Sequence, residues 1–172
     1  MVTIRPVQPG DSARLIAANL AARAFHAPWV APAITEERFA AGLADPRRVS
    51  LLAEDGGMLV GVINLSEIVR GSFLSAYLGY YGYPEGTGQG RMTAAVRLAI
   101  AHAFGPLGLH RVEANIQPEN ARSLALVRRL GFRREGYSPG YLFIEGAWRD
   151  HERWALLNPP ASAGPPCDRP AG

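Results

Sequence analysis

The sequence predicts an α/β fold in which a mixed, mostly antiparallel sheet of about six to seven strands carries helices on both faces. Three apolar runs in the middle of the chain are separated by glycine-containing turns, as in an antiparallel meander. The second half then alternates strand and helix patterns, which indicates a crossover between parallel neighbours. With 172 residues, 48% of them hydrophobic, the chain suffices for one continuous core. We therefore expect one domain over residues 1–158.

The N-terminal third predicts one strand and two helices. Residues 2–7 have the pattern of a strand, and residues 9–12 end it while offering side-chain oxygens that cap a helix. This first helix is predicted by apolar residues at helical spacing: Leu15, Ile16, Leu20 and Ala24. A second helix is expected to begin at Thr35, with acidic residues in its first turn, and to bury Phe39 and Leu43.

The remaining elements follow from turn residues and apolar periodicity. Strands are predicted over 49–54, 58–69, 73–83 and 110–116, and a closing strand pair over 141–144 and 151–157. A helix over 91–104 has a broad apolar stripe and ends at Gly105-Pro106, and a helix over 120–130 ends at Gly131. Residues 159–172 are mostly Pro, Ala, Gly and Ser, so we expect a disordered tail.

Composition excludes several classes of function. All 18 basic residues are arginine, so the chain has no lysine for a Schiff base or a phosphate loop. The single cysteine, Cys167, excludes an intrachain disulfide, and no His or Cys pair has metal-ligand spacing, so we expect no metal. The net charge of +3 comes without a basic block, so no direct nucleic-acid partner is expected.

The chain also lacks the patterns of a membrane protein. No apolar run approaches the roughly 18 residues of a membrane span, and the first residues lack a basic segment followed by an apolar one. We therefore expect a cytoplasmic protein with no membrane partner, either a monomer or a homodimer.

A glycine-rich turn, Gly86-Thr87-Gly88-Gln89-Gly90, lies between a predicted strand and the predicted helix that begins at Arg91. Such a turn supplies free backbone N–H groups, and the helix N-terminus adds partial positive charge, so the combination suits an anion. The run fits neither the dinucleotide fingerprint nor the phosphate loop. Taken alone, it is equally compatible with a flexible connector.

The sequence resembles the GNAT superfamily of N-acetyltransferases over almost its whole expected folded length, and it is most similar to the RimJ-type ribosomal-protein-alanine N-acetyltransferases. In the glycine turn, Glu85 stands where that family usually has Gln or Arg, which removes a donor side chain but no backbone amide. The segments that carry the closer resemblance are Val69-Arg70-Gly71-Ser72-Phe73, Tyr77-Leu78-Gly79-Tyr80, Gly90-Arg91-Met92, Leu130-Gly131-Phe132, Glu135-Gly136-Tyr137 and Trp148-Arg149-Asp150-His151.

The resemblance implies a GNAT fold with acetyl-coenzyme A (acetyl-CoA) as co-substrate. It implies that backbone amides of the Leu78–Tyr80 strand polarise the thioester carbonyl, where strands splay apart to admit the cofactor. The structural alternative for Asn120 is a helix N-cap, with Ser123 in the first helical turn. The residues that the resemblance assigns to cofactor binding are Leu78, Gly79, Tyr80, Gly86, Thr87, Gly88, Gln89, Gly90, Arg91, Met92, Asn120 and Ser123.

Acetyl transfer to an amine needs a neutral nucleophile, a stabilised oxyanion and a proton for the departing thiolate. Ser123 and Tyr137 compete as the proton donor, and the sequence does not choose between them. Glu113, which alternates with apolar neighbours on its predicted strand, is the candidate base, and Glu67 is the second choice. The structural alternative for Glu113 is an ion pair with an arginine such as Arg111 or Arg133.

Three hypotheses concern the acceptor. The first is the α-amine of a protein N-terminus, with a ribosomal protein as a possible partner, attacking the thioester directly; an α-amine pKa of about 8 makes it easier to deprotonate than lysine at about 10.4. The second is a small amine such as an antibiotic, a polyamine or an amino acid, which acidic residues at the acceptor mouth would favour. The third is a module that binds coenzyme A without transfer.

Residues 148–151 are candidates for one wall of an acceptor groove, with His26 and Trp29 opposite. The alternative is aromatic packing with solvated charges.

Overall fold

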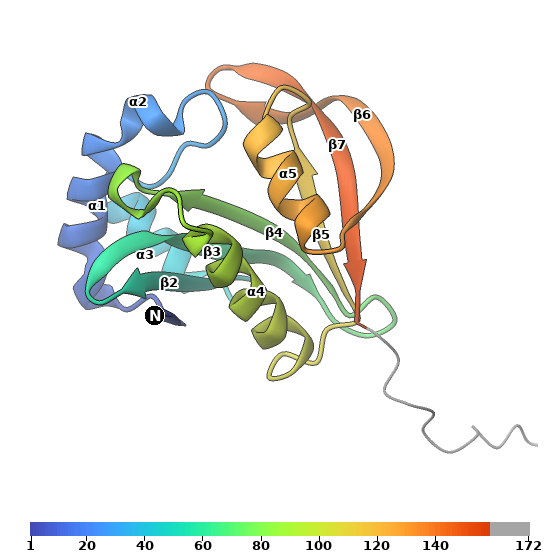
Figure 1. The fold of residues 1–172 in the computed structure, drawn as a ribbon, viewed down its shortest axis with the longest axis horizontal. Helices are drawn as coiled ribbons and strands as arrows, with labels where there is room; N and C mark the ends of the chain where they lie inside the picture. Colours follow the sequence, from blue (N-terminus) through green and yellow to red (C-terminus); the bar gives the residue numbers. More distant parts are fainter. Residues whose placement is uncertain (159–172) are drawn as a thin grey trace, which may run out of the picture.

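The computed structural model describes residues 1–158, so the predicted tail over 159–172, with Cys167, lies outside the described residues. Figure 1 shows a twisted sheet with helices on both sides. In chain order the elements are β1 (Val2–Pro6), η1 (Pro9–Asp11), α1 (Ser12–Ala21), α2 (Arg23–His26), α3 (Glu36–Ala44), β2 (Val49–Asp55), β3 (Met58–Val69), β4 (Ser75–Gly82), η2 (Pro84–Gly86), α4 (Arg91–Phe104), β5 (Arg111–Ile116), α5 (Ala121–Arg129), β6 (Arg133–Ile144) and β7 (Ala147–Leu157).

The sheet has seven strands in the order β1-β2-β3-β4-β5-β7-β6. Every neighbouring pair is antiparallel except β4 and β5, which are parallel because α4 forms the crossover between them. This arrangement confirms the predicted mixed, mostly antiparallel sheet of about six to seven strands.

The core lies on both faces of the sheet, because successive strand residues point to opposite sides. Leu51 and Ile63 pack with α4 and α5, whereas their neighbours Leu52 and Val62 pack with α1 and α3. The predicted helices therefore divide between the two faces (Figure 1). We call these the α4–α5 face and the α1–α3 face.

The parallel ladder between β4 and β5 is short. It consists of three residue pairs and ends where Tyr77 lies opposite Glu113. Beyond this point β4 continues to Gly82 paired with β3, and β5 continues to Ile116 paired with β7. The two strands therefore diverge, and the sheet has a gap between residues 78–82 and residues 114–116.

Two sequence expectations about elements were wrong. The first helix ends at Ala21, so the expected stripe does not continue: Leu20 is 51% exposed, and the buried positions are Leu15 and Asn19. The closing hairpin is much longer than expected, since β6 and β7 have 12 and 11 residues. Its irregular residues sit in a bulge between Ser138 and Leu142, which lets the strand pairing continue past Pro and Gly.

Gly86 packs closely against β3, and this contact fixes the glycine turn on the sheet. A Cβ at this position would lie 2.7 Å from the Leu59 carbonyl oxygen and 2.7 Å from the Val60 Cα. We expect Gly86→Ala to lower the free energy of unfolding by about 1–3 kcal/mol, because backbone atoms must shift. Urea denaturation measures the change. Gly10→Ala is the matched control, since nothing lies within 4 Å of its added Cβ; equal stability of the two variants would contradict the packing argument.

Candidate functional site

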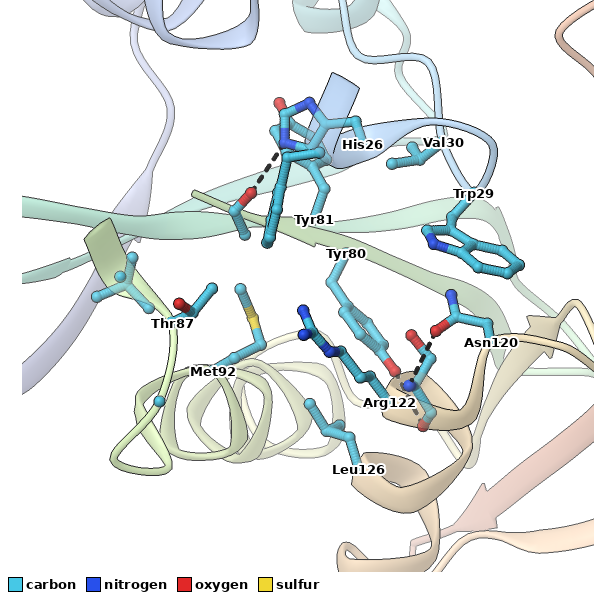
Figure 2. A pocket seen from close by; sticks show the side chains of 16 residues that line it. His26, Trp29, Val30, Tyr80, Tyr81, Thr87, Met92, Asn120, Arg122 and Leu126 are labelled. Atoms are coloured by element: carbon cyan, nitrogen blue, oxygen red, sulfur yellow. Dashed lines mark hydrogen bonds between the residues drawn. The ribbon is translucent and has the colours of Figure 1, made fainter. Parts of the chain in front are cut away.

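A first cavity of about 530 Å³ lies where the gap in the sheet meets α4 and α5. Figure 2 shows Thr87 and Met92 toward one end of it and Tyr80 with Asn120 toward the other. Its lining comes from α2 and the segment after it, from β3 and β4, from the glycine turn, and from α4 and α5 with the Asn120 cap: Phe25, His26, Trp29, Val30, Val60, Tyr80, Tyr81, Gly82, Gly86, Thr87, Gly88, Met92, Asn120, Arg122, Ser123 and Leu126.

A second cavity of about 600 Å³ shares part of this lining. Gly79, Asn115 and His151 line only the second cavity, and each alternates along its strand with residues of the α4–α5 core. The second cavity therefore extends toward the α1–α3 face. The two cavities meet at the gap in the sheet, where their common residues lie: Trp29, Val30, Tyr80, Asn120 and Ser123.

The glycine turn wraps the N-terminus of α4. Gly88, Gln89 and Gly90 have φ angles of 82°, 49° and 71°, in the left-handed region that glycine adopts most readily. The Arg91 N–H donates to the Gly88 carbonyl oxygen at 3.2 Å, so the first-turn N–H groups that remain for a ligand are those of Met92 and Thr93, where the helix dipole adds positive potential. Among the described residues 1–158, Arg122 is the only charged side chain that lines the first cavity. The cavity thus suits a ligand that joins an anionic part to an apolar part.

The structure brings only some of the predicted cofactor residues to this cavity. Tyr80, Gly86, Thr87, Gly88, Met92, Asn120 and Ser123 line it, and Gly79 lines the second cavity. Leu78 is buried in the core. Gln89, Gly90 and Arg91 lie at the turn without lining either cavity, and the Nε of Arg91 donates to Asp55 at 2.9 Å. Arg91 therefore anchors the start of α4 to the β2–β3 turn.

Three residues form the junction between the cavities. The backbone N–H of Ser123 donates to Asn120 Oδ1 at 3.1 Å, so Asn120 is the N-cap of α5. The Tyr80 hydroxyl donates to the Ser123 carbonyl oxygen at 3.4 Å. Burial raises the pKa of Tyr80 to about 12, so this hydroxyl stays protonated at neutral pH. Capping uses the oxygen of the Asn120 side chain, and its NH₂ group stays available to a ligand.

Glu113 and Tyr137, two of the three predicted catalytic residues, line neither cavity. Arg111 Nε donates to Glu113 Oε1 at 2.8 Å, which is the structural alternative considered for this carboxylate. Tyr137 is 46% exposed, and its hydroxyl donates to Asp150. The second-choice base, Glu67, pairs with an arginine on the surface. Of the predicted catalytic groups, the structure brings only Ser123 to the junction.

Two residues that line the second cavity carry a basic group, the imidazole of His151 and the carboxylate of Glu145, and of the two His151 is buried whereas Glu145 is exposed. The geometry of His151 suits a base. His151 is 2% exposed, and its Nδ1 lies 2.9 Å from the Arg149 carbonyl oxygen. Because a carbonyl oxygen only accepts, Nδ1 carries the proton and Nε2 keeps its lone pair. Burial lowers the pKa of His151, which opposes protonation of Nε2 near neutral pH. The sequence placed His151 in an acceptor groove but did not indicate this chemistry, since burial and tautomer depend on the packing of β7.

The other proposed groove residues come together in part. His26 lines the first cavity, and Trp29 lines both cavities. Trp29 also lines a further cavity of about 410 Å³ together with Trp148, Arg149 and Asp150, whereas His26 does not.

Several lining residues were missed by sequence reasoning: Arg38, Asn115, Gln117 and Arg122. The sequence does contain a signal for Asn115, because this polar residue alternates with apolar residues on its strand. In the structure its Oδ1 is buried without a hydrogen-bond partner within residues 1–158. Over the same residues, no helix has the length and apolarity of a membrane span, and no group of three potential ligands surrounds a metal position.

The fold and the two-cavity site define an α/β protein that can hold an anionic, partly apolar ligand beside a second ligand. The chain belongs to the acetyltransferase (GNAT) domain family, whose model matches residues 1–133.

Particular relatives sharpen this assignment. The chain is 42% identical over 123 residues to the [ribosomal protein uS5]-alanine N-acetyltransferase of Escherichia coli, a match that covers 72% of this chain and 59% of that protein. The chain thus spans less than two thirds of that relative. The structure of Mycobacterium smegmatis RimJ in complex with CoA-disulfide has a TM-score of 0.83 at 32% identity, covering 91% of this chain and 81% of that chain. Vibrio cholerae spermidine N-acetyltransferase in complex with CoA and spermine has a TM-score of 0.74 at 25% identity, with coverage of 91% and 95%.

His26, in the wall of the first cavity, makes the free energy of unfolding depend on pH. Its Nε2 donates to the Gly82 carbonyl oxygen at 2.8 Å, and its Nδ1 is buried without a partner within residues 1–158. Burial lowers the pKa of His26 below the ordinary 6.5. The unfolded chain therefore binds more protons as the pH falls below 6.5, and the free energy of unfolding decreases until the folded-state pKa is passed.

We expect acidification from pH 7.5 to 5.5 to destabilise the protein, and His26→Gln to flatten this dependence. Denaturant titrations at several pH values measure the slope, and His151 accounts for part of the remainder with the same sign. The same substitution at the exposed His110 controls for the loss of an imidazole as such. A slope that His26→Gln leaves unchanged would show that His26 does not carry the effect.

Proposed function

We propose that this protein transfers the acetyl group of acetyl-CoA to the α-amine of a protein N-terminus, with a ribosomal protein as the acceptor, in a cytoplasmic setting. The observation that carries the proposal is the meeting of two cavities at Tyr80, Asn120 and Ser123 through the gap between β4 and β5. A donor in one cavity and an acceptor in the other can then react by direct attack, without a covalent enzyme intermediate.

The first cavity suits acetyl-CoA. The glycine turn and the α4 N-terminus suit the pyrophosphate, and Arg122 adds a positive charge. Apolar residues such as Met92 and Leu126 suit the pantetheine chain. The complex of the similar RimJ from M. smegmatis with CoA-disulfide supports the same ligand class. When bound, acetyl-CoA supplies an activated thioester; no metal is part of the proposal.

Groups at the gap support the transfer step. Beyond Tyr77 the β5-facing edge of β4 has no paired strand, so N–H groups on that edge are free to polarise the acetyl carbonyl. Ser123 is the proposed donor of a hydrogen bond to the departing thiolate, since it lines both cavities. Tyr137, the competing donor, is held by Asp150 away from them.

His151 is the proposed base, acting through Nε2 directly or through one water. The amine nitrogen bonds to the acetyl carbon while the carbon–sulfur bond breaks, and the proton lost by the amine passes to His151. An α-amine pKa of about 8 means that presenting it neutral at pH 7 costs only about 1 kcal/mol, which a neutral imidazole can manage.

The second cavity favours a peptide over a polyamine. Its charged side chains are Arg38 and Glu145, and Asn115 and Gln117 offer amide groups suited to a peptide backbone. A polyamine carries several positive charges and would need several acidic partners. The cavity lacks such a cluster among its lining residues, so we place the α-amine of a peptide first.

Acetylation of peptides tests the proposal directly. We expect peptides that begin with Ala or Ser to gain one acetyl group in the presence of acetyl-CoA. Mass spectrometry detects this as a mass increase of about 42 Da, because one acetyl group replaces one amine hydrogen. Spermidine measured by thiol release is the parallel acceptor. Activity with spermidine alone would contradict the peptide assignment. If neither the peptides nor spermidine caused thiol release, transfer to these amines would be contradicted.

The proposed base has its own prediction. We expect His151→Gln to lower kcat by about 10²-fold, the contribution of a positioned general base, while the Kd for coenzyme A stays unchanged. The pH profile of kcat should also lose its rise through the imidazole pKa. Glu113→Gln is the comparison variant: a larger loss of kcat in Glu113→Gln than in His151→Gln would assign the base to Glu113 instead.

A further inference from the structure

A small cavity of about 170 Å³ on the α1–α3 face is lined by two arginines, and we call it the arginine pocket. Arg38 comes from the first turn of α3, and Arg48 from the segment that precedes β2. Ser50, Asn64 and Tyr81 add polar groups, and none of the lining side chains is acidic. The proposed transfer reaction uses neither arginine.

Arg48 is placed as an anion-binding group. Its Nε is buried without a hydrogen-bond partner within residues 1–158, and its Nη1 lies beneath α3, 3.7 Å from where a Cβ on Gly42 would stand. An unpaired, buried guanidinium N–H is costly, and the fork of N–H groups matches a carboxylate. A pocket with two guanidinium groups and no acid therefore calls for an anion.

The arginine pocket is continuous with the second cavity. Val30, Ala31 and Arg38 line both. Along the sheet, Ser50 pairs with Asn64, and Asn64 pairs with Gly79, so these three residues form one row across β2, β3 and β4. The Ser50 hydroxyl donates to Asn64 Oδ1 at 2.7 Å.

Gly79 keeps this row open. It lines the second cavity, and an added Cβ there would meet nothing within 4 Å. The floor of the second cavity is therefore open at Gly79, next to Asn64, which lines the arginine pocket. A chain that enters the second cavity by its amine can continue over Gly79 toward Arg48.

We propose that the arginine pocket binds a carboxylate of the acceptor, placed a few residues beyond the reacting α-amine. The proposal rests on the proposed function and names its substrate class: peptides with an acidic group near the N-terminus. The carboxylate has two possible sources, an Asp or Glu side chain or the C-terminal carboxylate of a short peptide, and both present the same group to Arg38 and Arg48.

Matched peptides test this subsite. Ala-initiated peptides carry a single Glu at position 2, 3, 4 or 5, each with a Gln counterpart, and all are amidated at the C-terminus. Short peptides with a free or an amidated C-terminus form the second arm. We expect KM to be at least about 10-fold lower for the Glu peptide than for its Gln counterpart at one position, or for the peptide with a free C-terminus than for the amidated one. One charge-assisted hydrogen bond produces a ratio of this size.

Variants then assign the preference to the pocket. Arg48→Gln should abolish the Glu-over-Gln ratio and leave the KM of the Gln peptide unchanged. Arg38→Gln, at an exposed position of α3, should reduce the ratio and serves if Arg48→Gln does not fold. Arg47→Gln is the matched control, because Arg47 is adjacent, 61% exposed and paired with Glu67 at 2.8 Å, and it does not line the pocket. It should keep the full ratio.

Equal KM values for every Glu and Gln pair, and for acid and amide, would overturn the subsite. A ratio that persists in both Arg48→Gln and Arg38→Gln would overturn it as well. If no peptide is acetylated, the proposed function fails instead, and calorimetric binding of the same peptides decides the subsite: binding that needs both Glu and Arg48 supports it, and binding indifferent to either contradicts it.

Discussion

The divergence of β4 and β5 beyond Tyr77 is the constraint on which the rest of the site depends. Parting two neighbouring strands removes ladder hydrogen bonds in the middle of a sheet, which is costly unless the freed groups find other partners. Each strand keeps its outer partner, β3 for β4 and β7 for β5, so each half of the sheet remains a complete layer. The bond from Tyr80 to the Ser123 carbonyl oxygen then joins the two halves across the opening.

Packing on both faces holds this opening in shape. The α4–α5 face carries the larger core, and Gly86 and Arg91 tie the start of α4 to β3 and to the β2–β3 turn. On the α1–α3 face, Asn19 accepts from Tyr83 at 2.8 Å and donates to the Ala33 carbonyl oxygen at 2.8 Å, which fixes the segment that lines the cavities. The two sides of the gap are thus supported by separate cores.

Local patterns predicted the parts of this structure that depend on local chemistry. The helix over 91–104, the meander from β2 to β4 and the glycine turn follow from periodicity, turn residues and glycine conformations. The patterns could not place Glu113 or Tyr137, because an alternating polar residue indicates a face but not what lies above it. The sequence placed His151 in the closing strand and in an acceptor groove, but its burial and tautomer depend on how β7 packs. The true extent of β6 was concealed by Pro139 and Gly140, which sit in a bulge. Arg38 and Arg48 required knowledge of how α3 lies on the sheet.

Gly79 lies in the middle of the sheet, yet nothing packs against it on the α1–α3 face, since an added Cβ would meet no atom within 4 Å. A glycine within a strand weakens it, since it contributes conformational entropy to the unfolded chain and no contacts to the folded one. A glycine at this position therefore lowers the stability of the sheet and leaves open space in the second cavity. One enlarged side chain here would narrow the floor of the second cavity without disturbing either core or the cavity behind the glycine turn. Under the proposed assignment of the two cavities, the fold can therefore diversify its acceptors while its donor stays fixed.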